Sequence, residues 1–258
     1  MINLETPQKF GFLVNQAHQV ATEIFRPNSR KYDRAEHSYP KELDMLAAVI
    51  DGMNESGALG GAGAGTVGGN ASGERSAKAD GNRNGTNMAS LLGLIELCWG
   101  DVGLMLTMPR QGLGQAAIAA VANEEQLARF GGKWAAMAIT EPEAGSDSAA
   151  IRTTARYDED TDEWVLDGEK IFVTSGDRAE LIVVWASLDR SKGRPAIKSF
   201  VVERENPGLK LDRLEHKLGI RASDTANFVL RDCRVPKENL LGSPEIDSKK
   251  GFSGVMQT

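Results

Sequence analysis

Apolar residues in the first half of the chain recur at intervals of three or four positions, the spacing that places them on one face of a helix. The pattern predicts a first helix over 10–24, and we expect Pro27 to end it because proline lacks the backbone N–H of a helix interior. Further helices are predicted over 43–50, 88–99, 101–106 and 112–122, with a short one beginning at residue 124. We therefore expect a helical N-terminal domain over residues 1–132.

Residues 56–87 interrupt this helical pattern. Glycine and alanine dominate the first part and polar residues the second, and such a composition buries too little apolar surface to offset the conformational entropy lost on folding. We interpret the segment as a mobile loop within the helical domain. So much glycine is also typical of a phosphate-binding loop, but the signature GxxxxGK[ST] does not occur and no strand leads into the segment.

After Trp134 the apolar spacing changes from about 3.6 residues to about 2, which indicates a change from helices to strands. Alternation predicts strands over 134–138, 152–157, 164–166, 170–174, 181–187, 199–203 and 228–230. Asp167-Gly168 is a tight-turn signal between two of them. We expect a middle domain over residues 133–241, a mostly antiparallel β-barrel or sandwich, and then a linker and the start of a helix over 242–258. The predicted fold class is α+β.

Composition and charge restrict the function. A formal net charge of −6 and a pI near 5.3 argue against indiscriminate binding to nucleic acid, since its phosphates would repel the average surface. The cysteines and histidines show no metal-ligand spacing, so neither a disulfide framework nor a metal site is predicted. No apolar run reaches membrane-spanning length and residues 1–7 lack the order of a secretory signal, so we expect a cytoplasmic protein.

Two segments carry the candidate chemistry: 138–147, which reads AITEPEAGSD, and 171–176, which reads IFVTSG. In the first, small residues let backbone donors approach a bulky polar group, with Gly145 as the point of closest approach. In the second, alternation sends Phe172 and Thr174 to the same face, where an aromatic plate lies beside a hydroxyl. A planar, redox-active ring would fit between such walls. Core packing of Phe172 and an ordinary strand threonine are the simpler alternatives.

The run Ala138–Ala150 resembles the signature of the acyl-CoA dehydrogenase family, flavoenzymes that oxidise acyl-CoA thioesters across the Cα–Cβ bond. Residues 219–225 and 235–239 also stand where the family carries similar residues. Residues 92–132 resemble the end of its helical N-terminal domain, and 134–241 resemble most of its middle β domain. The resemblance thus implies the acyl-CoA dehydrogenase fold, with the C-terminal four-helix bundle of the family lacking.

The same resemblance implies an FAD cofactor and supplies candidate contacts. The residues that stand for the family's cofactor contacts are Met137, Ile139, Thr140, Gly145, Ser146, Phe172, Val173 and Thr174. Those on its substrate side are Ser146, Arg221 and Ser223. From the residues themselves, Arg221 could equally form a structural ion pair with an acid such as Asp224, and Asp147 is expected to cap the turn that follows it.

Three positions depart from the family pattern. Phe172 stands where tryptophan is frequent and Ser175 where asparagine is frequent, so the type of contact is kept with a smaller group. Glu143 stands where a small residue is common, so the loop over 138–147 is expected to differ in its exact conformation from that of the family.

In the family, a glutamate from a C-terminal helical domain removes the α-proton of the thioester. The sequence ends before such a domain, so no residue of this chain is predicted to be the catalytic base. The resemblance therefore implies an FAD-dependent acyl-CoA dehydrogenase, inactive as this chain alone, of which the chain is the N-terminal part or one subunit. Its implied partners are an acyl-CoA substrate, an acceptor of the electron-transfer flavoprotein type, and a C-terminal domain or partner subunit in a homo- or hetero-oligomer.

Two alternatives remain open from the sequence. The chain could be a noncatalytic flavin-binding or scaffold subunit of a heteromeric complex, or an oxidase or monooxygenase on the same scaffold. The length and type of the acyl chain are not predicted.

Overall fold

The computed structural model describes residues 7–55, 86–109 and 113–246. Within these residues the chain forms two compact units. The first comprises the described residues up to Pro109 together with Lys217–Ser223, and the second comprises the remainder. The first is helical, and the second contains the described strands.

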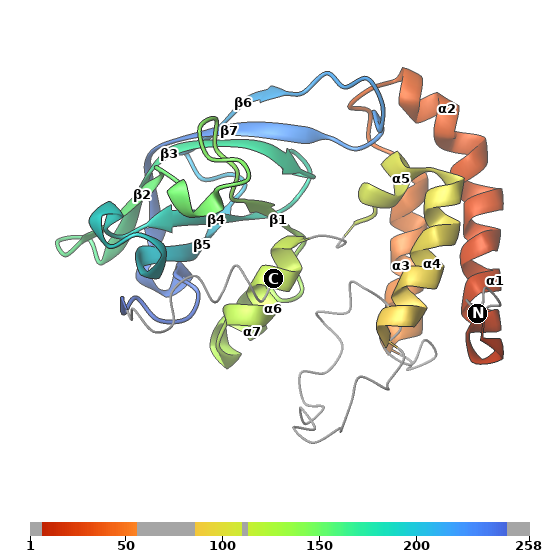
Figure 1. The fold of residues 1–258 in the computed structure, drawn as a ribbon, viewed down its shortest axis with the longest axis horizontal. Helices are drawn as coiled ribbons and strands as arrows, with labels where there is room; N and C mark the ends of the chain where they lie inside the picture. The colour runs from red at the N-terminus through yellow and green to blue at the C-terminus, as the bar shows by residue number, and fades with distance from the viewer. Residues whose placement is uncertain (1–6, 56–85, 110–112, 247–258) are drawn as a thin grey trace. The chain divides into compact units, whose positions relative to one another are not determined.

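Amphipathic helices build the first unit. They are α1 (Gly11–Val20), α2 (Arg26–Arg34), α3 (Glu42–Glu55), α4 (Thr86–Gly100) and α5 (Val102–Leu106), with a 3-10 turn over Gln8–Phe10 before α1. Helices α1 and α4 lie side by side (Figure 1). The buried core side chains are Phe25, Tyr32, Leu43, Leu46, Leu104, Met108 and Ala222. The helices predicted for this part of the chain are confirmed, including the break at Gly100, after which Asp101 caps α5 by accepting from the Leu104 N–H at 2.8 Å.

The prediction that Pro27 ends the first helix is wrong. A π-type turn over Ala21–Phe25 follows α1, and Pro27 lies in the first turn of α2, which continues to Arg34. Proline is tolerated in the first turn of a helix, because the N–H that it lacks has no obligatory partner there. The π turn ends at Phe25, and a new α-helical hydrogen-bond pattern begins with α2, which has the proline in its first turn.

Two predicted segments fall wholly or largely outside the described residues. Residues 56–85 hold most of the glycine-rich run predicted to be a mobile loop, and α4 begins directly after them at Thr86. Residues 247–258 hold most of the predicted linker and helix start. Both predictions remain predictions.

A seven-stranded sheet forms the centre of the second unit, as far as the described residues go. Its strands are β1 (Ala135–Ala138), β2 (Thr154–Asp158), β3 (Glu163–Thr174), β4 (Leu181–Ser187), β5 (Ile197–Glu203), β6 (Leu209–Leu214) and β7 (Thr225–Pro236). They run in the order β1-β4-β2-β3-β7-β6, and β5 pairs with β4 off this path. Most pairings are antiparallel as predicted, but β4 pairs in parallel with both β1 and β2, so the sheet is mixed.

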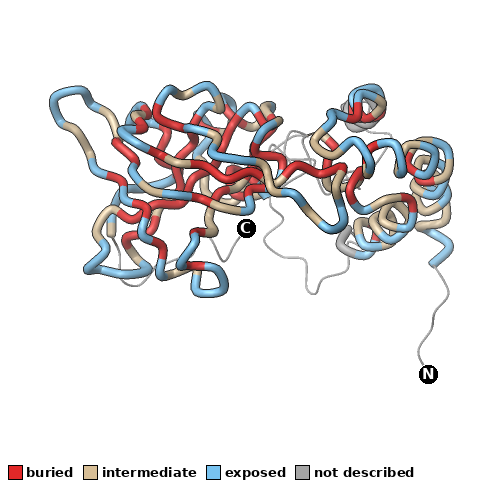
Figure 2. The backbone as a smooth tube through the Cα atoms, turned by 90° about the horizontal axis from the view of Figure 1, so that it is seen from above, coloured by how far each residue is buried: buried red, intermediate tan, exposed pale blue. Residues whose placement is uncertain are grey.

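Strand β4 is buried along its whole length and serves two cores. Ile182, Val184 and Ala186 face one core, whereas Leu181, Val183 and Trp185 face the other. Buried positions accordingly follow the strands of this unit, while the connecting loops are exposed (Figure 2). A strand buried on both faces at the centre of the sheet fixes the register of its neighbours, since a slip by one residue would exchange the two cores.

Two helices cover one face of the sheet: α6 (Leu113–Val121) and α7 (Glu124–Phe130). Ala117 and Ile118 of α6 pack in the core with Trp185 of β4. The backbone of α6 approaches β1 so closely that a Cβ at Gly114 would lie 2.2 Å from the Ala135 carbonyl oxygen, so only glycine fits.

The boundary between the two compact units lies between residues 109 and 110, so α6 and α7 belong to the second unit. The change of periodicity predicted a domain boundary between residues 132 and 133.

The strands differ from prediction at three places. Strand β3 is continuous through Asp167-Gly168, which forms a bulge against β7 and not a tight turn. Gly168 has φ +156, and a Cβ there would lie 2.4 Å from Oγ1 of Thr153. Strand β6 was not predicted, and β7 extends well beyond the predicted 228–230.

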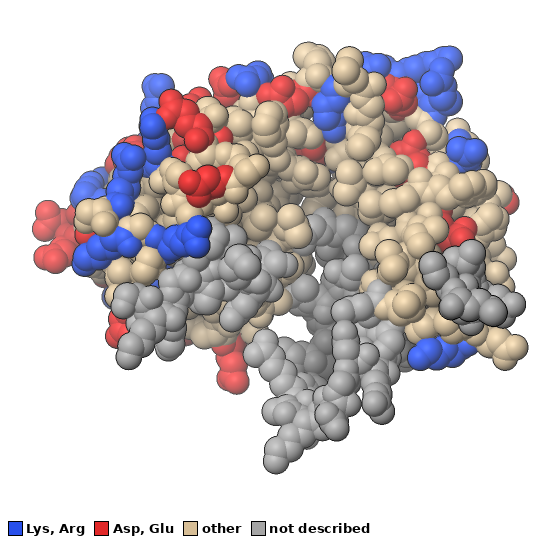
Figure 3. Space-filling view, viewed as in Figure 1, with Lys and Arg blue, Asp and Glu red and all other residues tan. Residues whose placement is uncertain are grey.

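Acidic and basic side chains are interspersed on the face of the molecule drawn in Figure 3. Among the described residues, no helix is both long enough and apolar enough to cross a membrane.

Glu42 links α2 to α3 and makes stability depend on pH. Its carboxylate accepts from Lys31 Nζ at 2.7 Å and from the Tyr32 hydroxyl, and these hydrogen bonds lower the pKa of Glu42 from 4.5 to about 2. Between these values the unfolded chain binds more protons than the folded chain, so this stabilisation is complete above about pH 4.5 and is lost as the pH falls toward 2.

We predict that Glu42→Gln lowers the free energy of unfolding at about pH 7 and that the difference from the unaltered chain shrinks at about pH 3. Urea unfolding at both pH values measures it. A difference that stays constant with pH would contradict this account.

Candidate functional site

The second predicted segment contains an exposed aromatic ring on a strained backbone. Phe172 lies in β3 with φ +59 and its side chain is 58% exposed. A positive φ is a genuine outlier for a bulky residue, and such strain persists only where surrounding contacts hold it. Val173 next to it is buried in the core, and Thr174 is again exposed. Core packing of Phe172 is therefore excluded.

Thr140 is joined to this strand by the backbone. The chain leaves β1 at Ala138, and the Thr140 carbonyl oxygen then accepts from the Ile171 N–H at 2.9 Å. Thr140 is half-buried, as is Ile139 before it. The two predicted segments, which are some thirty residues apart in sequence, are thus side by side in the second unit (Figure 1).

The loop after Thr140 closes on itself and then exposes its tip. Glu141 and Ala144 exchange backbone hydrogen bonds at 3.2 and 3.1 Å. Gly145, Ser146 and Asp147 follow and are exposed. Asp147 lies at the N-cap position of a 3-10 turn as predicted, but its side chain makes no capping hydrogen bond.

Gly145 has no packing reason within the described residues to be glycine. A Cβ built there meets no atom within 4 Å, and its φ lies outside the range that favours glycine. Gly114 and Gly168, in contrast, are each required by a neighbour closer than 3.0 Å. The space above Gly145 is open to a ligand.

A buried ion pair lies directly beneath these segments. Lys170 is fully buried and Glu141 is 5% exposed, and Lys170 Nζ lies 2.7 Å from Glu141 Oε1 and 3.1 Å from the Ile139 carbonyl oxygen. The carboxylate also accepts from the Arg152 N–H at 2.6 Å and from the Thr153 N–H at 3.0 Å. The pair therefore joins β3 to both ends of the loop that carries Gly145.

The charges of this pair oppose the effect of burial. Burial lowers the pKa of Lys170 to about 8, against the attraction of Glu141. Burial raises the pKa of Glu141, but the charge and hydrogen bond of Lys170 and the donors from Thr153 and Arg152 outweigh it, so this pKa is lowered. The attraction between the two groups thus favours the charged form of each.

The remaining predicted residues divide between the two units. Met137 is half-buried in β1, and Val173 is 1% exposed, so its side chain belongs to the core. Arg221 and Ser223 belong to the first unit, unlike the loop and strand described above. Arg221 Nη2 lies 3.0 Å from Glu36 Oε2, so its partner is Glu36.

Asp224, which the sequence offered as a partner of Arg221, contacts Arg178 instead. The Arg178 Nε lies 3.4 Å from Asp224 Oδ1, and the Asp177 N–H donates to Asp224 Oδ2 at 2.9 Å. Burial raises the pKa of Asp224, and Arg178 opposes that shift.

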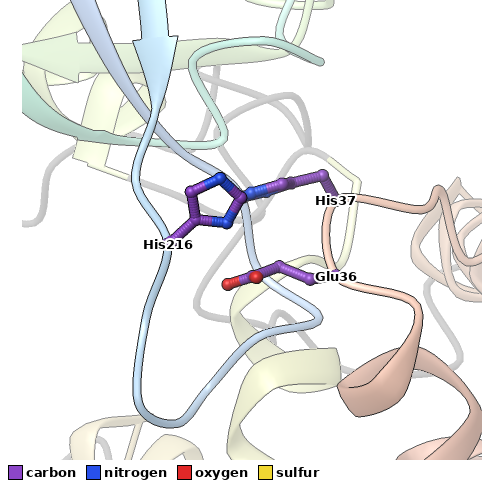
Figure 4. A group of neighbouring side chains, drawn as sticks. All are labelled: Glu36, His37 and His216. Carbon is purple, nitrogen blue, oxygen red and sulfur yellow. The ribbon is translucent and has the colours of Figure 1, made fainter.

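Three side chains of metal-ligating type are drawn in Figure 4. Glu36 and His37 follow α2 in the first unit, and His216 follows β6 in the second. Because they belong to different units, we assign no metal site to them.

Two residues beneath the site, Glu141 and Lys170, were missed from the sequence. A signal was present for Lys170, since a lysine at an inward position of an alternating strand needs a buried partner. No comparable pattern marks Glu141 as its partner, because the two residues are 29 positions apart in sequence.

Known proteins share this fold and part of this sequence. The family model described as "Acyl-CoA dehydrogenase, middle domain" matches residues 136–233. The mitochondrial short-chain specific acyl-CoA dehydrogenase of Rattus norvegicus is 49% identical over 128 residues, which are 50% of this chain and 30% of that protein. The structure of butyryl-CoA dehydrogenase from Megasphaera elsdenii has a TM-score of 0.76 at 28% identity and covers 99% of this chain and 63% of that one. An acyl-CoA dehydrogenase from Bacillus anthracis, solved in complex with FAD, has a TM-score of 0.72 at 26% identity and covers 100% of this chain and 41% of that one.

The resemblance seen in the sequence is thereby confirmed, and residues 136–233 match the model of the family's middle domain. The α+β fold is confirmed as well, since the structural match extends over nearly the whole chain. The chain spans 30% of the length of the rat relative and less than two thirds of the two solved chains.

We predict that Lys170→Met lowers the free energy of unfolding by about 3 to 5 kcal/mol, because it leaves the Glu141 carboxylate buried without its counter-charge. Lys31→Met is the matched control: its Nζ also lies 2.7 Å from a glutamate oxygen, but both partners are at least one-third exposed. Chemical denaturation measures both variants. The control should lose far less stability, and equal losses would show that burial of the Lys170 pair carries no special weight.

Proposed function

We propose that this chain forms one wall of an FAD site in an acyl-CoA dehydrogenase, an enzyme that oxidises an acyl-CoA thioester across the Cα–Cβ bond. The observation that carries the proposal is the exposed Phe172 ring, held at positive φ beside Thr174 and next to the loop of Thr140 and Gly145. The rat and Megasphaera relatives are named as acyl-CoA dehydrogenases, and the Bacillus anthracis relative was solved with FAD.

The residues present fit a flavin nucleotide. An exposed aromatic ring offers a stacking surface, and the hydroxyls of Thr140 and Thr174 can donate hydrogen bonds. Gly145 leaves its backbone open to a bulky group, and Ser146 beside it adds an exposed hydroxyl. This set of an aromatic plate, neutral donors and an open glycine suits a ring joined to a pyrophosphate better than it suits a metal ion, which would require clustered carboxylate or imidazole ligands.

Bound FAD would supply the acceptor for a hydride equivalent from the substrate. The chain's own contribution is binding and orientation. Thr140 and Thr174 would place fixed donors where negative charge develops, which stabilises a charge without reorganisation at the moment of reaction. Phe172 would exclude water from one face of the ring, and the Lys170–Glu141 pair would hold the Thr140 segment against β3.

We infer that the base that removes the α-proton lies outside the described part of this chain. The two buried carboxylates near the site are already engaged: Glu141 with Lys170, and Asp224 with Arg178 and the Asp177 N–H. A general base must reach the proton that it removes, and neither carboxylate is exposed to do so. The resemblance implies a glutamate from a C-terminal helical domain or a partner subunit.

The substrate, acceptor and location follow from the same proposal. The names of the rat and Megasphaera relatives favour a short-chain acyl-CoA. We propose a carrier of the electron-transfer flavoprotein type as acceptor, assembly into an oligomer, and a cytoplasmic location, although the rat relative is named as mitochondrial.

Titration with FAD followed by anaerobic addition of butyryl-CoA tests the proposal. We expect the chain to bind FAD with quenched flavin fluorescence, and we expect bleaching of the visible absorbance by butyryl-CoA only when the part that carries the base is present. Absence of FAD binding would refute the proposal. Rapid reoxidation by oxygen of the reduced, complete protein would favour an oxidase, and binding without reduction in the complete protein would favour a noncatalytic subunit.

Gly145→Ala separates ligand approach from packing. Because a Cβ there meets no atom of the chain, we predict a change in the free energy of unfolding within about 0.5 kcal/mol and a clear loss of FAD affinity. Thermal unfolding without FAD and fluorescence titration with FAD measure the two effects. Gly168→Ala is the opposite control, since Thr153 would obstruct its Cβ and stability should fall. Unchanged FAD affinity in Gly145→Ala would remove this residue from the site.

A further inference from the structure

The strand that carries Phe172 has a bulge opposite a single residue of β7. Lys170 pairs with Phe228 and Val173 with Ala226, so Ile171 and Phe172 together stand opposite Asn227. A bulge leaves an extra residue outside the regular ladder and turns its side chain in a new direction. Both backbone donors of the bulge therefore need acceptors other than the regular ones.

Two different acceptors satisfy them. The Ile171 N–H donates to the Thr140 carbonyl oxygen at 2.9 Å. The Phe172 N–H donates to the side-chain oxygen of Asn227, Oδ1, at 3.1 Å. Asn227 is 2% exposed, so its amide replaces a ladder acceptor inside the protein where water cannot.

A carboxylate fixes the orientation of this amide. Asn227 Nδ2 donates to Glu215 Oε1 at 2.6 Å. A carboxylate only accepts, so it holds the amide nitrogen toward itself and directs the amide oxygen toward Phe172. Glu215 is in turn held by Arg213, whose Nε lies 3.1 Å from the same oxygen, and by its own N–H, which donates to the Thr225 carbonyl oxygen at 2.9 Å.

We propose that Asn227 is a positioning residue, which holds Phe172 at positive φ so that its ring contacts the flavin, and that Glu215 orients Asn227 for this purpose. The inference rests on the proposed FAD site and adds to it a residue that touches neither cofactor nor substrate. A purely structural role, in which Asn227 only satisfies a buried N–H, is the competing account. The two accounts differ in whether the contact between the Phe172 ring and the flavin depends on the side-chain amide of Asn227.

The experiment compares the full chain with Asn227→Ala, Phe172→Ala and the double variant, each titrated with FAD while flavin fluorescence is recorded. Stacking on an aromatic ring contributes about 0.5 to 1.5 kcal/mol, so Phe172→Ala should weaken FAD binding roughly two- to tenfold and relieve the quenching. Asn227→Ala should reproduce both effects, and the double variant should add nothing further. Glu215→Ala, which removes the acceptor of the Asn227 Nδ2 hydrogen bond, should weaken FAD binding and relieve the quenching in the same direction as Asn227→Ala, and an unchanged titration would remove Glu215 from the proposal.

Asn206→Ala is the structural control. Its side-chain oxygen likewise accepts from a backbone N–H, that of Gly208 at 2.9 Å, and its Nδ2 donates to the Arg234 carbonyl oxygen at 2.7 Å, but it lies in the turn before β6. It should lower the melting temperature and leave the fluorescence quenching of bound FAD unchanged. If Asn227→Ala behaves in the same way as Asn206→Ala, the positioning role is overturned.

Hydrogen exchange of the Phe172 amide without FAD separates this proposal from the proposed function. The amide should be protected in the unaltered chain and exchange faster in Asn227→Ala. If the unaltered chain binds no FAD, the proposed function fails. Faster exchange in the variant would still show that the Asn227 side chain holds the Phe172 N–H. Equal exchange in the two proteins overturns that hold whatever the affinity for FAD.

Discussion

The buried pair of Lys170 and Glu141 is the interaction on which the candidate site depends. Removing two charges from water is unfavourable, and a hydrophobic pair of similar volume would often be at least as stable. This pair does what such a replacement would not, because it satisfies the Ile139 carbonyl and the N–H groups of Arg152 and Thr153. Polar backbone at both ends of an irregular loop is thereby linked to β3 through side-chain hydrogen bonds. A loop held at its base can expose its tip, with Gly145, and still keep one conformation.

A second constraint acts on the same strand. Regular pairing with β7 would give Phe172 an ordinary strand conformation and an ordinary ladder acceptor. The bulge instead gives one donor to the Thr140 carbonyl and the other to Asn227. The hydrogen bond from Ile171 thus draws the first segment against the strand, while the hydrogen bond from Phe172 fixes the exposed ring. One local departure from the ladder brings together the two segments that the sequence marked separately.

The sequence predicted the elements better than their connections. Helical and alternating spacing identify most helices and strands, because burial of one face is visible in the order of residues. Pro27 and Gly168 were misjudged, since a proline after a π turn and a glycine in a bulge look the same in sequence as a helix end and a turn. Alternation predicted Phe172 and Thr174 on one face, but Lys170 two positions before Phe172 is buried, so the exposure of Phe172 depends on the bulge. The ion pair beneath joins residues 29 positions apart. Arg221 was grouped with the wrong acid because nearness in sequence favoured Asp224 over Glu36.

The cost of exposing Phe172 argues for a ligand more strongly than any single motif does. A positive φ on an aromatic residue is unfavourable by about 1 to 3 kcal/mol, and exposing the ring forgoes burial that a core position would provide. Both costs fall on the protein before any ligand binds. A rigid site of this kind binds more tightly than a flexible one, because the conformational entropy of its side chain and loop has already been lost during folding. The Lys170–Glu141 pair and Asn227 supply that rigidity from beneath, which explains why buried polar groups gather under the exposed ring and loop.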